Sequence, residues 1–163
     1  MRPNAITRIP LRARDRKTVR AYVIIDAADA AWVNQWRWCL IGQYAGRRAT
    51  IDGRSRYFLL HRELLGLTFG DSMEGDHIDR DKLNCRRSNL RSVTKRGNRQ
   101  NVASRKGASS QYRGVSWDKA AGKWVAGIGI DGKRKYLGYF DDEDEAAEVA
   151  RAARARFLPF ALD

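Results

Sequence analysis

The segment from Lys123 to Phe157 constrains the fold of this chain more than any other. Four apolar residues alternate with polar or small ones, as in a strand with one buried face: Trp124, Ala126, Ile128 and Ile130. The Asp131-Gly132 pair is typical of a two-residue hairpin turn, and 133–140 supplies the returning strand. From Asp141 to about Phe157, an acidic first turn and basic last turns suit a helix dipole. We therefore expect a small three-stranded antiparallel sheet covered by one helix.

Charge is the main signal in the composition. Thirty-two Lys and Arg face nineteen Asp and Glu, which gives a net charge of +13 and a pI near 10.3. Such a surplus favours a polyanionic partner, because each neutralised phosphate releases counterions. An anionic membrane surface would need a basic amphipathic helix or a lipidation signal, and the sequence has neither. No apolar run approaches the roughly 20 residues that span a bilayer, so we expect a cytoplasmic protein that binds nucleic acid.

The two cysteines, Cys39 and Cys85, are isolated in the sequence. They form no Cys-x-x-Cys pair, so we expect neither a zinc site nor a disulfide framework. A reduced protein is the simplest interpretation.

Composition divides the chain into residues 1–101, a polar basic linker at 102–111, and residues 112–163. The first part contains a β-type run that ends at Asp26 and a possible short helix from Asp29 to Trp38. Residues 57–60 read as a further strand, followed by a helical turn at 61–67. The arginines between Arg12 and Arg20 suit either a DNA-contacting arm or solvated charge.

Polar residues between Gly75 and Asn101 include the groups that phosphodiester hydrolysis needs. Water must lose a proton, and a neutral histidine can accept it because its pKa lies near neutral pH. A hard divalent ion held by oxygen ligands can stabilise the phosphate and the leaving oxygen. Asp76 and His77 are adjacent, so on a strand their side chains point to opposite sides. Asn98 lies in a helix-prone segment, and its amide oxygen is a second candidate metal ligand.

This arrangement resembles the HNH endonuclease family, in particular its phage and intron-encoded homing-type members. The resemblance rests on Asp76-His77-Ile78-Asp79-Arg80-Asp81-Lys82-Leu83-Asn84, on Arg87-Ser88-Asn89-Leu90-Arg91-Ser92-Val93-Thr94, and on Asn98. It implies a ββα-metal unit with its core at 57–101. Asp76 and Asn98 would hold one Mg²⁺ or Mn²⁺ ion, and His77 would be the general base. Asn89 would pin the loop of the motif through hydrogen bonds.

Two neighbouring features bear on the same resemblance. His61-Arg62-Glu63-Leu64 is similar to a His-Arg turn that often precedes the motif. His61 and Arg62 are therefore candidate phosphate contacts, although a hydrogen-bonded structural role explains His61 equally well. Gly75 stands where the family usually has a hydrophobic residue, and we expect a looser first strand there.

The C-terminal segment resembles the DNA-binding domain of plant ethylene-response factors, the APETALA-two type. Four motifs carry the resemblance: Tyr112-Arg113-Gly114-Val115, Gly122-Lys123-Trp124, Tyr136-Leu137-Gly138-Tyr139-Phe140 and Glu145-Ala146-Ala147. It implies a sheet laid in the major groove. The implied DNA contacts are Arg113, Lys123, Arg134 and Tyr136. Alternation turns Val125 outward as well, while Gly127 and Gly129 replace long polar side chains, so we expect salt-sensitive binding with weak base discrimination.

We thus predict an α+β protein in which a ββα-metal HNH domain precedes a three-stranded sheet packed on one helix. Its expected activity is metal-dependent cleavage of double-stranded DNA that leaves 5′-phosphate and 3′-hydroxyl ends, as in a phage or mobile-element homing nuclease. No obligate protein partner is evident. A non-catalytic, sequence-specific regulator would share the charge but would not need Asp76, His77 and Asn98 together. An RNA-binding protein has less support, because no aromatic stacking pair is evident.

Overall fold

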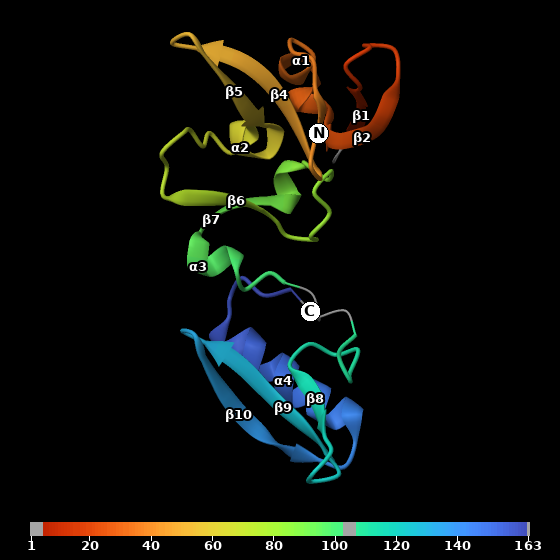
Figure 1. Ribbon diagram of the computed structural model, residues 1–163, viewed down its shortest axis with the longest axis vertical. Coiled ribbons are helices and arrows are strands. Elements are labelled where there is room, and N and C mark those ends of the chain that lie inside the picture. Colours follow the sequence, from red (N-terminus) through yellow and green to blue (C-terminus); the bar gives the residue numbers. More distant parts are fainter. Residues whose placement is uncertain (1–4, 103–106, 163) are drawn as a thin grey trace. The chain divides into compact units, whose positions relative to one another are not determined.

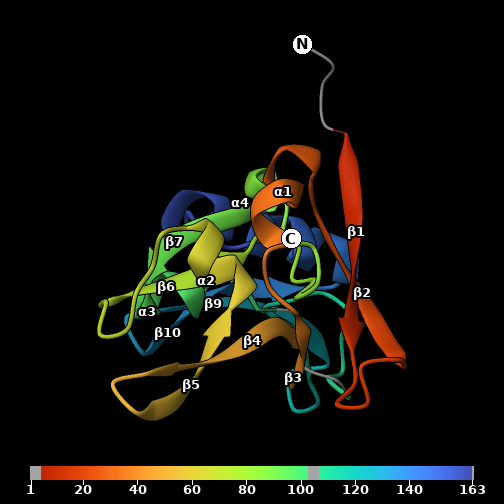
Figure 2. The ribbon, with the colours of Figure 1, turned by 90° about the horizontal axis from the view of Figure 1, so that it is seen from above.

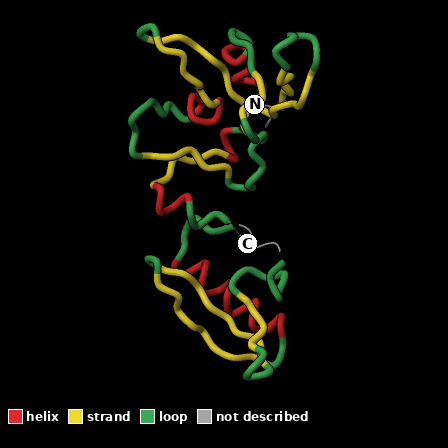
Figure 3. The backbone as a smooth tube through the Cα atoms, viewed as in Figure 1, coloured by secondary structure: helices red, strands yellow, loops and turns green. Residues whose placement is uncertain are grey.

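The computed structural model describes residues 5–102 and 107–162. They belong to two compact units, Met1–Asn98 (unit 1) and Arg99–Asp163 (unit 2). Unit 1 contains three small antiparallel sheets and unit 2 contains one, among the residues described. In unit 1 the helices are single turns between strands and loops, whereas unit 2 contains one long helix (Figure 3). The predicted linker 102–111 falls inside the bounds of unit 2, and its residues 103–106 lie outside the described residues. No described helix has the length and hydropathy needed to cross a bilayer.

Unit 1 begins with an antiparallel hairpin of β1 (Ile6–Arg12) and β2 (Val19–Asp26). Alternate residues of the hairpin are buried and form part of the unit's core: Ile9, Leu11, Val23 and Ile25. A 3-10 turn (Ala27–Asp29) and α1 (Ala30–Val33) follow. The helix predicted from Asp29 to Trp38 is therefore reduced to one α-helical turn. The buried indole N–H of Trp38 donates to the Val33 carbonyl at 2.8 Å, which takes an acceptor that a longer helix would use.

The next three strands are β3 (Cys39–Ile41), β4 (Tyr44–Ile51) and β5 (Arg54–Leu59), in sheet order β3-β4-β5. Asp52-Gly53 forms the turn between β4 and β5, and both residues have positive φ, as a tight hairpin requires. β3 also lies against the β1–β2 hairpin (Figure 2), so the sheet and the hairpin share one core.

The predicted motif is built on α2 (Leu60–Leu64), β6 (Met73–His77), β7 (Leu90–Thr94) and α3 (Lys95–Asn98). β6 and β7 pair antiparallel, with Asp76 opposite Arg91 and His77 opposite Leu90. The loop between them is tied to β2, because Ile24 exchanges backbone hydrogen bonds of 2.8 Å with Leu83 and Cys85. The single turn α3 follows directly after β7 (Figure 1).

Unit 2 has the predicted sheet and helix. Its strands are β8 (Val115–Asp118), β9 (Lys123–Ile130) and β10 (Lys133–Phe140), in order β10-β9-β8, and α4 (Glu143–Phe157) packs on them. A small core lies between sheet and helix: Val115, Ala126, Ala146, Ala147 and Ala150, with Trp124 and Leu137 beside it. The carboxylate of Asp142 accepts from the Glu145 backbone N–H at 2.9 Å, so the helix starts two residues later than predicted.

The outward face expected for β9 is less exposed than predicted. Only 4% of Val125 is exposed, and Gly127 is buried as well, whereas Gly129 is exposed. β9 is the central strand, and Val125 lies between Ser116 of β8 and Tyr139 of β10. The register also shifts between Tyr136 and Gly138, so strict alternation does not hold along β10.

Candidate active site

The end of β6 places Asp76 and His77 side by side in the interior of unit 1. Only 2% of Asp76 and none of His77 is exposed. Asn98, the last residue of α3, is half-buried. Asp76 and His77 thus lie on β6 and Asn98 on α3, and α3 contacts both β6 and β7.

The carboxylate of Asp76 is held by Arg91 from the opposite strand. Arg91 Nε lies 2.9 Å and Arg91 Nη2 2.8 Å from Asp76 Oδ2. This contact fixes the orientation of a buried carboxylate.

A second carboxylate, which sequence reasoning missed, belongs to the same group. Glu74 precedes Asp76 by two residues on β6, so the two side chains leave the strand on the same face. Asn98 Nδ2 donates to Glu74 Oε2 at 2.7 Å, which ties α3 to the strand. The two-residue spacing between Glu74 and Asp76 is the signal that could have revealed it.

Glu74, Asp76 and Asn98 offer oxygen atoms that could hold a hard divalent ion. Within the described residues, no group of three or more His, Cys, Asp or Glu side chains could hold a metal. Two carboxylates and one amide are nevertheless enough for Mg²⁺, which is commonly bound through one or two carboxylates and keeps several waters. The donor set therefore fits a magnesium-like or manganese-like ion.

His77 is packed among groups that keep its imidazole neutral. Burial and then the charge of Lys82 lower the pKa of His77, Asp76 opposes them, and the net value is about 4. The Cys85 sulfur lies 3.6 Å from His77 Nε2, and the ring of Tyr44 lies 6.0 Å away between centroids. At neutral pH, His77 therefore carries no charge, and its pKa lies well below the near-neutral value that the sequence analysis expected.

His61 packs directly on His77, with 4.7 Å between the ring centroids. Only 4% of His61 is exposed, and burial lowers its pKa to about 3, with His77 as the next cause. Its Nδ1 is buried without a hydrogen-bond partner among the residues that the structure describes. The burial favours a structural role for His61 over contact with phosphate.

Gly75 explains how His61 comes so close to the strand. A Cβ at this position would lie 2.6 Å from His61 Cδ2 and 3.2 Å from Leu65 Cδ1. The expectation that Gly75 loosens the first strand is therefore wrong. The missing side chain makes room for the imidazole of α2, and β6 keeps a regular register with β7.

Asn89 lies at the centre of the loop that leaves His77. Its Oδ1 accepts from the Asp79 backbone N–H at 2.9 Å, and its Nδ2 donates to Asp79 Oδ1 at 2.8 Å and to the Asn84 carbonyl at 2.7 Å. Asn89 is 7% exposed. These bonds stay within the loop, in the manner expected of a residue that shapes it.

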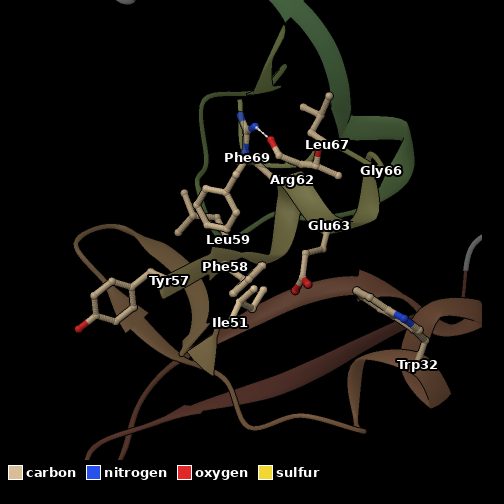
Figure 4. Close-up of a pocket in the computed structure, with 11 residues that line it drawn as sticks. Trp32, Ile51, Tyr57, Phe58, Leu59, Arg62, Glu63, Gly66, Leu67 and Phe69 are labelled. Atoms are coloured by element: carbon tan, nitrogen blue, oxygen red, sulfur yellow. Dashed lines mark hydrogen bonds between the residues drawn. The ribbon is translucent and has the colours of Figure 1, made fainter. Parts of the chain in front are cut away.

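Arg62 borders an apolar hollow of about 610 Å³ beside α2 (Figure 4). Aromatic and aliphatic side chains form most of its lining: Trp32, Ile51, Tyr57, Phe58, Leu59, Leu67 and Phe69. Arg62 Nη2 donates to the Thr68 carbonyl at 2.7 Å, and Nη1 to the Met73 carbonyl at 3.4 Å. The guanidinium thus holds the chain between α2 and β6, and its contact with phosphate stays a prediction.

The predicted DNA contacts of unit 2 differ in their surroundings. Arg113 Nη1 donates to the Gln100 carbonyl at 2.8 Å, and Lys123 pairs with Asp141 at 2.9 Å. Arg134 and Tyr136 are exposed on β10, with the guanidinium 5.3 Å from the ring centroid of Tyr136. Of the four, Arg134 and Tyr136 are therefore the most accessible.

A comparison with protein families bears on this geometry. Residues 59–100 match the HNH endonuclease family model. The matched segment runs from the end of β5 through α3 and includes all the residues of the candidate site on β6, β7 and α3. This segment is therefore similar to HNH endonucleases. No curated protein and no solved structure matches the chain, and the comparisons give no support to the ethylene-response-factor resemblance.

Proposed function

We propose that the protein is a metal-dependent endonuclease that hydrolyses phosphodiester bonds of double-stranded DNA and leaves 5′-phosphate and 3′-hydroxyl ends. One observation carries the proposal: two carboxylates and an amide stand beside a buried, neutral histidine in the segment that matches the HNH family. The net charge of +13 suits a nucleic-acid substrate.

In this proposal Glu74, Asp76 and Asn98 would hold one Mg²⁺ or Mn²⁺ ion. When bound, such an ion supplies a positive charge that stabilises the phosphate and the leaving 3′-oxygen. Arg91 orients the Asp76 carboxylate through the ion pair of 2.8 Å. His77 accepts the proton of the attacking water, since its imidazole is neutral at the working pH. Because His77 has no exposed surface, water reaches it only when neighbouring side chains move.

Unit 2 would hold the enzyme on duplex DNA through its sheet. The exposed Arg134 and Tyr136, together with Lys123 and Arg113, are the proposed contacts. The three-stranded antiparallel sheet packed on one helix and the exposure of Arg134 and Tyr136 support this role. In this proposal, unit 1 cleaves the DNA and unit 2 binds it, as in a homing nuclease of a phage or mobile element that acts in the cytoplasm of a bacterial cell.

A non-catalytic DNA-binding regulator is the alternative. The ion pair between Arg91 and Asp76 favours it, because it gives the buried carboxylate a structural partner without any metal. The two functions differ in whether the chain cleaves DNA at all.

A plasmid-nicking assay with Mg²⁺ or Mn²⁺ separates them. We expect wild type to nick supercoiled DNA, and His77→Ala to lose about 10²- to 10⁴-fold of the rate, as when a general base is removed. Asp76→Asn should also abolish cleavage, while the control Asp52→Asn, an exposed turn residue, keeps the full rate. DNA ligase should reseal the product, because it needs both predicted ends. A wild type that never nicks, or a fully active His77→Ala, would contradict the nuclease proposal.

A further inference from the structure

An arginine-rich cleft of about 690 Å³ opens on unit 1, away from the residues of the candidate active site. Five exposed arginines line it: Arg14, Arg16, Arg20, Arg37 and Arg48. Its lining residues come from the β1–β2 hairpin with its turn and from the β3–β4–β5 sheet with the segment before it. β3 lies against that hairpin (Figure 2). No described Asp or Glu lines this arginine cleft.

The cleft arginines differ from other arginines of unit 1 in their partners. Three other arginines of this unit are neutralised by carboxylates, in ion pairs of 2.5–2.8 Å: Arg47–Glu63, Arg87–Asp29 and Arg91–Asp76. Among residues 5–102, none of the five cleft arginines forms an ion pair with a carboxylate. Like charges gathered in one place repel each other, so the cleft is a site that an anion would stabilise.

The wall formed by the β1–β2 turn is ordered by hydrogen bonds rather than by charge pairing. Asp15, the acid of this turn, accepts from the backbone N–H groups of Lys17 and Thr18, both at 2.9 Å, and from the Thr18 hydroxyl at 2.5 Å. Arg37 Nη2 donates to the Ala13 carbonyl at 2.6 Å, which ties the turn to the opposite wall. The carboxylate therefore shapes the turn and also attracts Arg20, whereas Arg14 and Arg16 are exposed beside it.

We propose that the arginine cleft binds the phosphodiester backbone of duplex DNA. The inference rests on the proposed function, since it takes DNA as the substrate, and it adds a binding surface in the nuclease unit. Guanidinium groups suit this partner, because their planar fork donates two parallel hydrogen bonds to phosphate oxygens. Tyr57 and Leu40, which are 56% and 38% exposed at the cleft, can contact the sugars between phosphates.

A binding measurement on the full chain tests the cleft without requiring cleavage. In EDTA, the variant Arg14→Gln/Arg16→Gln/Arg20→Gln should bind a short DNA duplex about ten- to a hundredfold more weakly than wild type. The slope of log affinity against log salt should fall by about 0.9 for each lost phosphate contact, or by about 3 in all.

The control variant removes the same charge from exposed arginines of unit 1 outside the cleft: Arg8→Gln/Arg54→Gln/Arg56→Gln. Arg54 and Arg56 leave β5 on the face opposite to Tyr57. The control should stay within about threefold of wild-type affinity, since its arginines would contact few phosphates. Equal losses in the two variants would overturn the proposal, because net charge alone would then explain the binding.

Cys39 provides a second and local measurement, because it lines the cleft. The chain has two cysteines, and burial raises the pKa of the Cys85 thiol to about 12, which makes it unreactive. Alkylation therefore reports on Cys39. We expect duplex DNA to slow this alkylation in wild type but not in the triple cleft variant. Equal rates with and without DNA, or stronger protection by structured RNA than by duplex DNA, would overturn the proposal.

These outcomes are separate from those of the nicking assay. A chain that nicks DNA while Cys39 stays unprotected would refute the cleft and leave the nuclease. A chain in which DNA protects Cys39 but that never nicks would support the cleft and refute the nuclease.

Discussion

Replacing Gly75 with alanine tests how the candidate active site is packed. The added methyl group would lie 2.6 Å from His61 Cδ2, 3.2 Å from His61 Nε2 and 3.2 Å from Leu65 Cδ1, whereas ordinary contacts lie at 3.4–4 Å. The strand itself is fixed by its register with β7, so the ring of His61 must retreat by roughly 1 Å. Overpacking of this kind costs about 1–3 kcal/mol of the free energy of unfolding.

The displacement of His61 should also lower the rate of DNA cleavage, because the rings of His61 and His77 are in contact, with 4.7 Å between their centroids. A misplacement of about 1 Å at a reacting group can reduce a rate by about a hundredfold. Urea denaturation measures the first effect, and the nicking assay measures the second. Gly129→Ala is the matched control, since no atom lies within 4 Å of the Cβ it would add.

A double-mutant cycle identifies the clash itself. His61→Ala removes the ring that the methyl group meets, so Gly75→Ala should cost less in that background than in wild type, with a coupling free energy of about 1 kcal/mol or more. A Gly75→Ala protein as stable as wild type, or strictly additive effects, would refute the packing argument.

Three other expectations follow from the contacts described above. Asn89→Ala should lower the free energy of unfolding by about 1–3 kcal/mol in urea titrations, because it leaves the Asp79 and Asn84 backbone groups without their buried partner. A change of less than about 0.5 kcal/mol would show that the loop is stable without the Asn89 hydrogen bonds. Because the folded-state pKa values of His77 and His61 lie at about 4 and 3, below the ordinary 6.5, the unfolded chain takes up protons first on acidification. Stability should therefore be complete above pH 6.5 and fall toward pH 4, by at most about 1.4 kcal/mol per pH unit for each histidine, and a flat profile in that window would contradict their burial. Asp142→Ala should cost unit 2 about 1 kcal/mol in thermal unfolding through loss of the α4 cap, and Asp142→Asn should retain most of it.

The sequence predicts unit 2 well and much of unit 1 poorly, and the reason is visible in the strands. β9 carries apolar residues on alternate positions, so its period of two can be read directly. β4 is as long and β5 is two residues shorter, but arginine, glycine, serine and threonine interrupt their apolar residues, and much of the hairpin is exposed. Their Asp52-Gly53 turn is the same signal as Asp131-Gly132, and only the turn could have revealed that hairpin.

In the candidate site, too, some features can be predicted from the sequence and others cannot. Asp76, His77 and Asn98 were predictable, since their order and spacing along the chain form a motif. The contact of His61 with His77 was not, because it depends on α2 packing against β6, and no local pattern encodes that approach. The glycine that permits the contact looked like a defect in the strand until its neighbour was known.

The arginines likewise show what the fold adds to the sequence in predicting function. Along the sequence, Arg14, Arg47 and Arg91 are equivalent charges, and their sum indicates only a polyanionic partner. In the fold, Arg47 and Arg91 are neutralised by carboxylates, while Arg14 faces a cleft that no described acid lines. Only charges without a partner in the protein release counterions when a phosphate binds. The salt dependence of DNA binding should therefore follow the cleft and the exposed sheet of unit 2, and not the total charge of +13.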